Sequence, residues 1–353
     1  MKILNAFGAM LLLALALTLT GCDRNENVIR IFNWGDYMDG SIFAEFTELT
    51  GIEVRVTYFA SNEEMHTRVT AGGTGAGFDL LFPSDFMIER MIREELLRPI
   101  NLDNIPNLRY IDQRFLDLPF DPGNRYSVPY KWGTLGILYN RAMVDAIAGD
   151  ITVDSWNILW DERFEGNIFM YDTEREVFTV ALKLLGYSIN TTSIDELHAA
   201  RDLLKVQRPL VRAFIGDPVR DSMIGREAAL AMAYSGDAMF TMAHNNDLNF
   251  VVPMEGTSVW YDAMVIPRSA RNPEGAEAFI NFLSDPAIAL RNTLYSGYST
   301  ANRGAFEMLP EEIRNNPIYW PPYDVFERSE PTLHLGDFIA TITRAWEEVL
   351  AHR

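Results

Sequence analysis

Residues 28–59 read VIRIFNWGDYMDGSIFAEFTELTGIEVRVTYF, and this stretch decides the fold. The apolar run 28–32 predicts a strand, 41–49 predicts an amphipathic helix that ends at Gly51, and 52–58 predicts a second strand. A helix between two strands returns the chain to the end of the sheet where the first strand began, so the two strands run parallel. We therefore expect an α/β fold with a largely parallel sheet.

The same alternation of strands and helices continues along the chain. The patterns predict further helices at 63–71, 86–97, 175–185, 194–204 and 238–244, and further strands at 79–82, 136–139, 167–171, 230–234, 249–252 and 259–266. A chain of roughly 330 residues after an export signal exceeds what one core usually spans, so two lobes are expected. The turn-rich stretch 119–129 looks like the boundary between them.

The N-terminus carries a lipoprotein signal. A charged Lys2 precedes a short apolar run, 11–19, which is too short for a membrane span and ends in Leu19-Thr20-Gly21-Cys22. Residues 1–21 are then a signal peptide, and 22–27 are a polar tether anchored to a membrane by the lipidated Cys22. The alternative is a buried N-terminal helix with an incidental cysteine. Because Cys22 is the only cysteine, no disulfide within one chain can form.

The net charge of −19 limits the partners of the protein. Nucleic acid and anionic lipid surfaces would be repelled, whereas small cations would be attracted. The acidity could also serve solubility alone. The five histidines lack metal-ligand spacing, so we expect no metal and no cofactor. The glycine-rich stretch 72–77 follows a predicted helix and precedes a strand, which does not fit a phosphate loop.

Aromatic and acidic residues recur together where predicted strands end. Ligands of α/β proteins bind at the carboxyl ends of strands, and an alkylammonium needs carboxylates for its charge and ring faces for its methylenes. In the last strand, the i, i+2 spacing places an indole and a carboxylate on one face. The candidate ligand-binding residues of these strand ends are Trp34, Asp36, Tyr37, Ser84, Asp85, Phe86, Thr173, Glu176, Tyr234, Asp237, Trp260 and Asp262.

Each candidate also has a structural explanation. Trp34 and Trp260 could be core aromatics, and Thr173 with Glu176 could form a capping box for their own helix. The aspartates before helices could be helix caps. Clustered carboxylates could instead serve a glycosidase, and a tethered adhesin is a third class. No nucleophile elbow, zinc helix or Walker loop occurs, so we expect no enzyme.

Several motifs resemble the spermidine/putrescine-binding proteins of bacterial polyamine ABC transporters. They are NWGDY (33–37), YFASNEEM (58–65), FDLLFPS (78–84), SVPYKWG (127–133), REVF (175–178), the segment 260–267 and Gly297-Tyr298. The resemblance implies a two-lobed periplasmic-binding-protein fold of type II, with the ligand cleft between the lobes. It also implies a polyamine ligand, a membrane permease with its ATPase as partners, and an extracytoplasmic or periplasmic location. Such a protein is expected to be a monomer.

The resemblance also implies a division of the chain and of the site. The first lobe would comprise 28–134 and 260–306, and the second lobe 135–259 and 307–353. Trp34, Tyr37, Trp260 and Tyr298 would line the methylene chain; Asp36, Glu176 and Asp262 would bind the amines; Ser84 and Phe86 would add contacts from the first lobe. Spermidine-preferring members carry Asp at the position of Thr173 and Trp at that of Tyr234, whereas Asp237 resembles an acid of putrescine-preferring members. The pocket therefore looks mixed, and another small cationic amine remains an alternative ligand.

Overall fold

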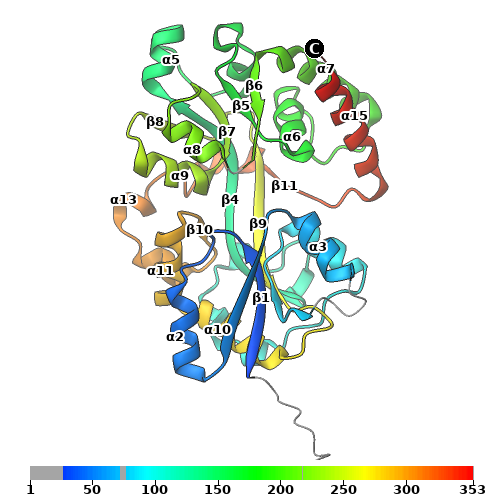
Figure 1. The fold of residues 1–353 in the computed structure, drawn as a ribbon, viewed down its shortest axis with the longest axis vertical. Helices are drawn as coiled ribbons and strands as arrows, with labels where there is room; N and C mark the ends of the chain where they lie inside the picture. The colour runs from blue at the N-terminus through cyan, green and yellow to red at the C-terminus, as the bar shows by residue number, and fades with distance from the viewer. Residues whose placement is uncertain (1–26, 72–76, 217, 353) are drawn as a thin grey trace, which may run out of the picture.

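The computed structural model describes residues 27–71, 77–216 and 218–352, and it contains two lobes joined by long strands (Figure 1). The expected signal peptide and Cys22 lie outside the described residues. Strands β4 and β9 run vertically through the waist between the lobes in Figure 1. This arrangement confirms the expected two-lobed α/β fold.

The first lobe forms the lower half of Figure 1. Its strands are β1 Val28–Trp34, β2 Glu53–Phe59, β3 Leu80–Leu81, β9 Ser258–Val265, β10 Ser299–Thr300 and the first half of β4 Ser127–Asn140. Its helices are α2 Ser41–Thr50, α3 Asn62–Ala71, α4 Asp85–Arg93, α10 Pro273–Leu283, α11 Pro286–Ser296 and α12 Arg303–Met308.

The second lobe contains the other half of β4. Its further strands are β5 Ile168–Met170, β6 Val211–Phe214, β7 Leu230–Tyr234 and β8 Leu248–Val251. Its helices are α5 Arg141–Ala148, α6 Glu174–Leu184, α7 Ile194–Gln207, α8 Val219–Ile224, α9 Ser235–His244 and α15 Ile339–Ala351. Near the waist lie α13 Glu311–Arg314, α14 Tyr323–Arg328 and β11 Glu330–Pro331.

The side-chain alternation of β1 explains why the first lobe has helices on both faces of its sheet. Ile29 and Ile31 point into a core formed with Phe46 of α2 and Phe279 of α10. Phe32 points the other way, into a core with residues of α3 and α4. A strand that is apolar on both faces must be covered on both, and the flanking helices supply that cover.

Strand β4 passes from one lobe to the other without a break. Its residues up to Thr134 pair with β9, and from Leu135 onward they pair with β7. The core of the second lobe begins with Leu135 and ends with Val349 of α15. The change of lobe therefore falls inside a strand.

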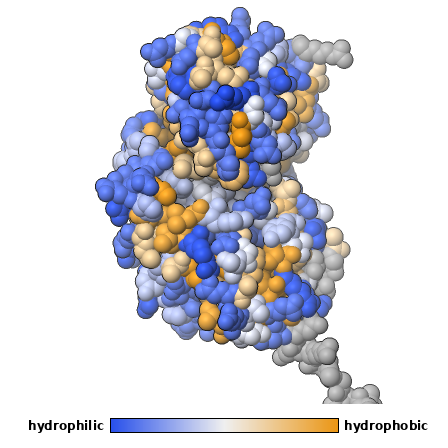
Figure 2. All heavy atoms as spheres, turned by 60° about the vertical axis from the view of Figure 1, so that its left-hand side comes forward, coloured by the Kyte–Doolittle hydropathy of each residue, from blue (hydrophilic) through white to orange (hydrophobic). Residues whose placement is uncertain are grey.

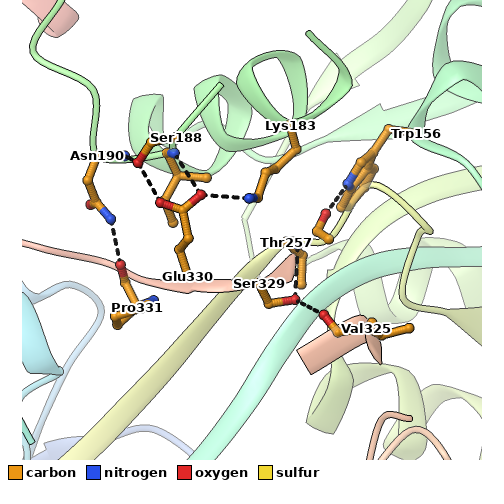
Figure 3. A network of polar contacts seen from close by, with 11 residues as sticks. Trp156, Lys183, Ser188, Asn190, Thr257, Val325, Ser329, Glu330 and Pro331 are labelled. Atoms are coloured by element: carbon orange, nitrogen blue, oxygen red, sulfur yellow. Dashed lines mark hydrogen bonds and ion pairs between the residues drawn. The ribbon is translucent and has the colours of Figure 1, made fainter. Parts of the chain in front are cut away.

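The last crossing between the lobes follows β11, and hydrogen bonds fix this strand to the second lobe (Figure 3). The carboxylate of Glu330 accepts hydrogen bonds from Nζ of Lys183 at 2.6 Å and from the hydroxyl of Ser188. The side-chain amide of Asn190 donates to the carbonyl of Pro331 at 2.8 Å. The β11 strand also pairs with β9, so it is attached at the waist and to the second lobe.

Three expectations need correction. The sheet is parallel around β1, around β5 and between β9 and β11, but β4 runs antiparallel to its neighbours and β9 runs antiparallel to β3 and β4. The turn-rich stretch 119–129 is no boundary, since Phe120 packs into a core of the first lobe. Residue 307 is too early for the last return to the second lobe, since Trp320 packs on Trp132 at 5.0 Å between ring centroids.

Short 3-10 helices fill several of the connections. They are η2 Leu102–Asn104, η3 Pro106–Tyr110, η4 Gln113–Phe115, η5 Pro122–Asn124, η6 Trp156–Trp160, η7 Glu162–Phe164, η8 Arg208–Leu210 and η9 Gly336–Phe338. The expected helix 86–97 ends earlier, at Arg93. Strand β4 is much longer than the expected strand at 136–139.

Candidate functional site

Three tyrosine–carboxylate pairs gather where the two lobes meet. In each pair a tyrosine hydroxyl donates a hydrogen bond to a carboxylate of a different segment. The pairs are Tyr37 with Asp262 at 2.7 Å, Tyr298 with Asp237 at 2.8 Å, and Tyr234 with Glu176 at 2.9 Å. All six residues are among those expected from the sequence, and the fold brings them together from both lobes.

Asp262 is a buried carboxylate on β9. Its second oxygen accepts a hydrogen bond from the hydroxyl of Ser84 at 2.7 Å, and the amide of Asn62 in turn donates to Ser84. Burial raises the pKa of Asp262 to about 6, although the hydrogen bonds from Ser84 and Tyr37 favour the charged form. A cationic ligand would stabilise the charged form of such a carboxylate, because the ligand's charge offsets the cost of desolvating the carboxylate.

A buried lysine holds the Tyr37 segment in place. Nζ of Lys131 on β4 donates to the carbonyl oxygen of Tyr37 at 2.7 Å and to the hydroxyl of Ser296 at 2.6 Å. The ammonium lies 4.1 Å from the centre of the Tyr37 ring. Burial lowers the pKa of Lys131, whereas Asp262 opposes that shift. Lys131 therefore fixes the loop that presents the Tyr37 hydroxyl to Asp262.

Glu176 stands in the first turn of α6, and it faces the site. Thr173 is the N-cap residue of this helix, but its side chain makes no capping hydrogen bond. The Glu176 carboxylate accepts from Tyr234 instead of reaching back to the cap. The capping-box alternative is therefore wrong for this pair.

Asp237 lies in the first turn of α9 and is buried. Besides the Tyr298 hydroxyl, it accepts a hydrogen bond from the hydroxyl of Tyr171 at 3.3 Å. Tyr298 belongs to the first lobe, so its hydrogen bond to Asp237 joins the two lobes directly. Burial, together with Asp237, raises the pKa of Tyr298, so this hydroxyl stays protonated and remains a donor.

Aromatic rings form a continuous row between the carboxylates. The ring centroids of Tyr37 and Tyr298 are 5.2 Å apart, those of Tyr298 and Trp260 are 5.4 Å apart, and those of Trp260 and Tyr234 are 6.0 Å apart. Glycine is required beneath this row, because a Cβ on Gly236 would lie 2.2 Å from the Tyr298 ring. The row supplies apolar ring area between Asp262 in one lobe and Glu176 in the other.

Two buried polar atoms of the predicted site residues have no hydrogen-bond partner among the described residues. One is Oδ2 of Asp85, whose other oxygen accepts from the backbone N–H of Phe86 at 2.8 Å. The other is Nε1 of Trp260. Burial raises the pKa of Asp85 well above its usual range, and the charge of Asp262 raises it further.

Four predicted residues lie at the margin of this arrangement. Trp34 packs on Phe59 and donates its indole N–H to the carbonyl of Phe82 at 2.8 Å. Phe86 is half-buried against a core of the first lobe. Thr173 and Asp36 are exposed.

Sequence reasoning did not select four residues that contribute to the site. Lys131 and Asn62 lie inside the quoted motifs, and Tyr171 directly follows β5, so the rule on strand ends could have found it. Arg220 of α8 lies 3.7 Å from Asp36 and 3.9 Å from Asp237, between guanidinium nitrogen and carboxylate oxygen. No motif pointed to Arg220.

The arrangement defines a class of protein that binds a small solute between two lobes. The described residues contain no group of three or more His, Cys, Asp or Glu side chains placed to hold a metal ion. In the same part of the chain, no helix combines the length and apolar character that a membrane span needs.

Comparison with known proteins assigns the family. The model of the bacterial extracellular solute-binding proteins matches residues 41–320, and this chain belongs to that family. The spermidine/putrescine-binding periplasmic protein of Escherichia coli strain K12 is 35% identical over 318 residues, which cover 90% of each chain.

Solved structures agree with this assignment. A spermidine/putrescine ABC transporter protein of Listeria monocytogenes is 40% identical, with a TM-score of 0.86 over 93% of this chain and 100% of the other. The TpPotD lipoprotein of Treponema pallidum is 28% identical, with a TM-score of 0.82 over 91% of this chain and 99% of the other.

Proposed function

We propose that this chain captures a polyamine outside the cytoplasm and delivers it to an ABC permease that is driven by an ATPase. The observation that carries the proposal is the set of three tyrosine–carboxylate pairs, which come from both lobes and lie along one row of aromatic rings. The relative from Escherichia coli is named as a spermidine/putrescine-binding protein, and this name supports the same ligand class.

The chemistry of a polyamine matches the parts of this site. An alkyl diammonium needs a carboxylate at each end and apolar surface along its methylenes, and it gains further from ring faces near its charges. Asp262 and Glu176 supply acids in different lobes, and the rings of Tyr298 and Trp260 lie between them. We assign Asp262 and Glu176 as the two ends of the ligand site.

Contacts from both lobes couple binding to closure. A ligand that touches both lobes gains most of its interactions only when they come together, so it shifts the protein toward the closed state. The bend falls in the segments that join the lobes, which include β4 and β9. The closed, loaded form is then the one that the permease receives.

Further parts of the proposal concern location and specificity. We place the protein on the extracytoplasmic face of a membrane, anchored through lipidated Cys22, and the name of the lipoprotein from Treponema pallidum supports this. We propose no enzymatic activity. With an uncharged Thr173 at a position where an acid would bind a third amine, the pocket should bind putrescine at least as well as spermidine.

Titration calorimetry tests the proposal. A soluble form that begins at Asn25 is titrated with putrescine, spermidine and lysine. We expect both polyamines to bind and lysine to bind far more weakly, because its carboxylate would face the acids of the site. Absence of heat with both polyamines at millimolar concentration would refute the proposed ligand class.

A further inference from the structure

We infer that Arg220 closes one end of the ligand cleft and makes the site favour diamines over triamines. The inference rests on the proposed function, and it names the residue that sets which polyamine fits.

Arg220 links the two lobes through two acids. Its guanidinium lies 3.7 Å from the carboxylate of Asp36, in the first lobe, and 3.9 Å from that of Asp237, in the second. The guanidinium also lies 5.3 Å from the ring centre of Phe240 on α9. These contacts with both lobes hold the cation at the end of the cleft.

The position of Arg220 changes what Asp237 can offer a ligand. Asp237 is buried and already accepts hydrogen bonds from Tyr298 and Tyr171. With a guanidinium at ion-pair distance as well, its negative charge is balanced within the protein. A ligand ammonium would have to displace Arg220 before it gained the full attraction of Asp237. Asp262 and Glu176 instead accept their hydrogen bonds from neutral hydroxyls.

A groove lies on the outer side of Arg220. It has a volume of about 550 Å³ and is lined by Asp36, Pro218, Arg220, Asp221, Phe240, Tyr295 and Ser296. The helices α8, α9 and α11 lie on the left of Figure 1, and Figure 2 brings that side forward, where a mostly hydrophilic surface is broken by apolar atoms near the boundary of the lobes. Arg220 thus lines this groove and also lies beside Asp237, an acid of the tyrosine–carboxylate pairs.

The length of the ligand follows from this arrangement. A diamine places its charges at Asp262 and Glu176 and leaves Arg220 where it is. A triamine carries a third ammonium, which like-charge repulsion would keep away from the guanidinium. If Arg220 were removed, the third ammonium could reach Asp237 or extend into the groove, where Asp221 offers another carboxylate.

Calorimetry on Arg220→Gln tests the inference. Each variant is titrated with putrescine, spermidine and 4-aminobutyrate. Arg226→Gln is the matched control, because Arg226 is also an arginine of the second lobe in an ion pair, at 2.7 Å from Asp247 on the surface. Both variants lose one positive charge, so the comparison removes the general effect of net charge on a cationic ligand.

We expect Arg220→Gln to raise the affinity for spermidine relative to putrescine by about tenfold, and Arg226→Gln to leave that ratio unchanged. Arg220→Lys, which keeps the charge, should retain the wild-type ratio and shows whether charge is the cause. Adding Asp221→Asn to Arg220→Gln should reduce the gain for spermidine.

Other results would overturn the inference. If wild type binds putrescine but Arg220→Gln leaves the ratio within twofold, Arg220 does not set the ligand length, while the proposed function stands. If wild type prefers 4-aminobutyrate and loses it in Arg220→Gln, the arginine instead binds a ligand carboxylate. If wild type binds neither polyamine, the inference and the proposed function both fail.

Discussion

The hydroxyl of Tyr298 donates a hydrogen bond to Asp237 across the two lobes, at 2.8 Å. Tyr298 follows α11 in the first lobe, and Asp237 stands on α9 of the second. The two lobes also pack closely here, because Gly236, next to Asp237, has no Cβ that would collide with the Tyr298 ring. One residue thus contributes to the aromatic row and to the contact between the lobes.

Tyr298→Phe should loosen the contact between the lobes without removing the ring. A hydrogen bond to a charged acceptor contributes about 1.5–3 kcal/mol, so its loss should shift the ligand-free protein toward the open form. Small-angle scattering should detect a larger radius of gyration for the ligand-free variant. Tyr58→Phe, on an exposed tyrosine of the first lobe, is the control. An unchanged radius of gyration would mean that this hydrogen bond does not hold the lobes together.

Asp262→Asn should nearly abolish polyamine binding. Removing the desolvated carboxylate that pairs with a ligand ammonium costs on the order of 2–5 kcal/mol of binding free energy, which is roughly 30-fold to several-thousand-fold in affinity. Calorimetry measures this loss, and circular dichroism verifies the fold. Asp145→Asn, at a surface ion pair of α5, should bind like wild type. Binding of Asp262→Asn within threefold of wild type would remove Asp262 from the site.

The affinity for polyamines should fall in acid. Burial raises the pKa of Asp262 to about 6, so below that pH the carboxyl is protonated and must lose its proton before it binds an ammonium. The dissociation constant should therefore rise by up to about tenfold for each pH unit below 6.

The stability of the ligand-free protein should respond to pH in the opposite direction. The folded state binds this proton more tightly than the unfolded state, whose pKa is near 3.8. The contribution of Asp262 to stability is therefore present at low pH and is lost as the pH rises through 6. Calorimetry and thermal unfolding between pH 4.5 and 7.5, the assay range, measure both effects. If Asp262→Asn shows the same pH profiles as wild type, another group is responsible.

Thr173→Asp should change specificity and stability separately. An added carboxylate at the N-terminus of α6, which also carries Glu176, should shift preference toward spermidine, because a triamine needs a further acid. Aspartate is also a better N-cap than threonine, so α6 should gain up to about 1 kcal/mol of stability. Competition titration and thermal unfolding measure the two effects. Higher stability with unchanged preference would place residue 173 outside the ligand site.

Glu330→Gln should destabilise the second lobe. The carboxylate holds Lys183 and Ser188, and the ammonium of Lys183 is largely buried, so loss of the charge should reduce the free energy of unfolding by about 1–3 kcal/mol (Figure 3). Chemical denaturation measures this loss. Glu307→Gln, at an exposed ion pair with Arg303, should change it by less than about 0.5 kcal/mol. Equal effects in the two variants would contradict a role for the Glu330 network.

The sequence alone predicted most of the elements and much of the site, because these features depend on residues that are close together in the chain. Short runs of apolar residues placed β1 and β7 correctly, and acids or tyrosines at strand ends marked Tyr37, Asp237 and Tyr234. The rest depended on contacts between distant segments. The ion pairs of Arg220 depend on how α8 faces the loop after β1, and periodicity carries no such information.

Local sequence patterns also failed to predict the full length of β4. Residues 127–134 include Pro129 and Lys131, which are poor signals of a buried strand. They are stabilised there by β9, from a segment more than a hundred residues later in the chain. The same pairing explains why Lys131 is buried, a position that composition alone would assign to solvent.

Two glycines of β4 fix the register of that strand where it passes between the lobes. Gly133 lies under the Trp260 ring and Gly136 under the Phe250 ring, where a Cβ would approach to 2.5 Å and 2.3 Å respectively. One residue inserted between them would move one glycine away from its ring and turn every later side chain of the strand to the opposite face. Insertions and deletions in this architecture should therefore accumulate in the loops of each lobe, while the spacing from Gly133 to Gly136 keeps its three-residue step.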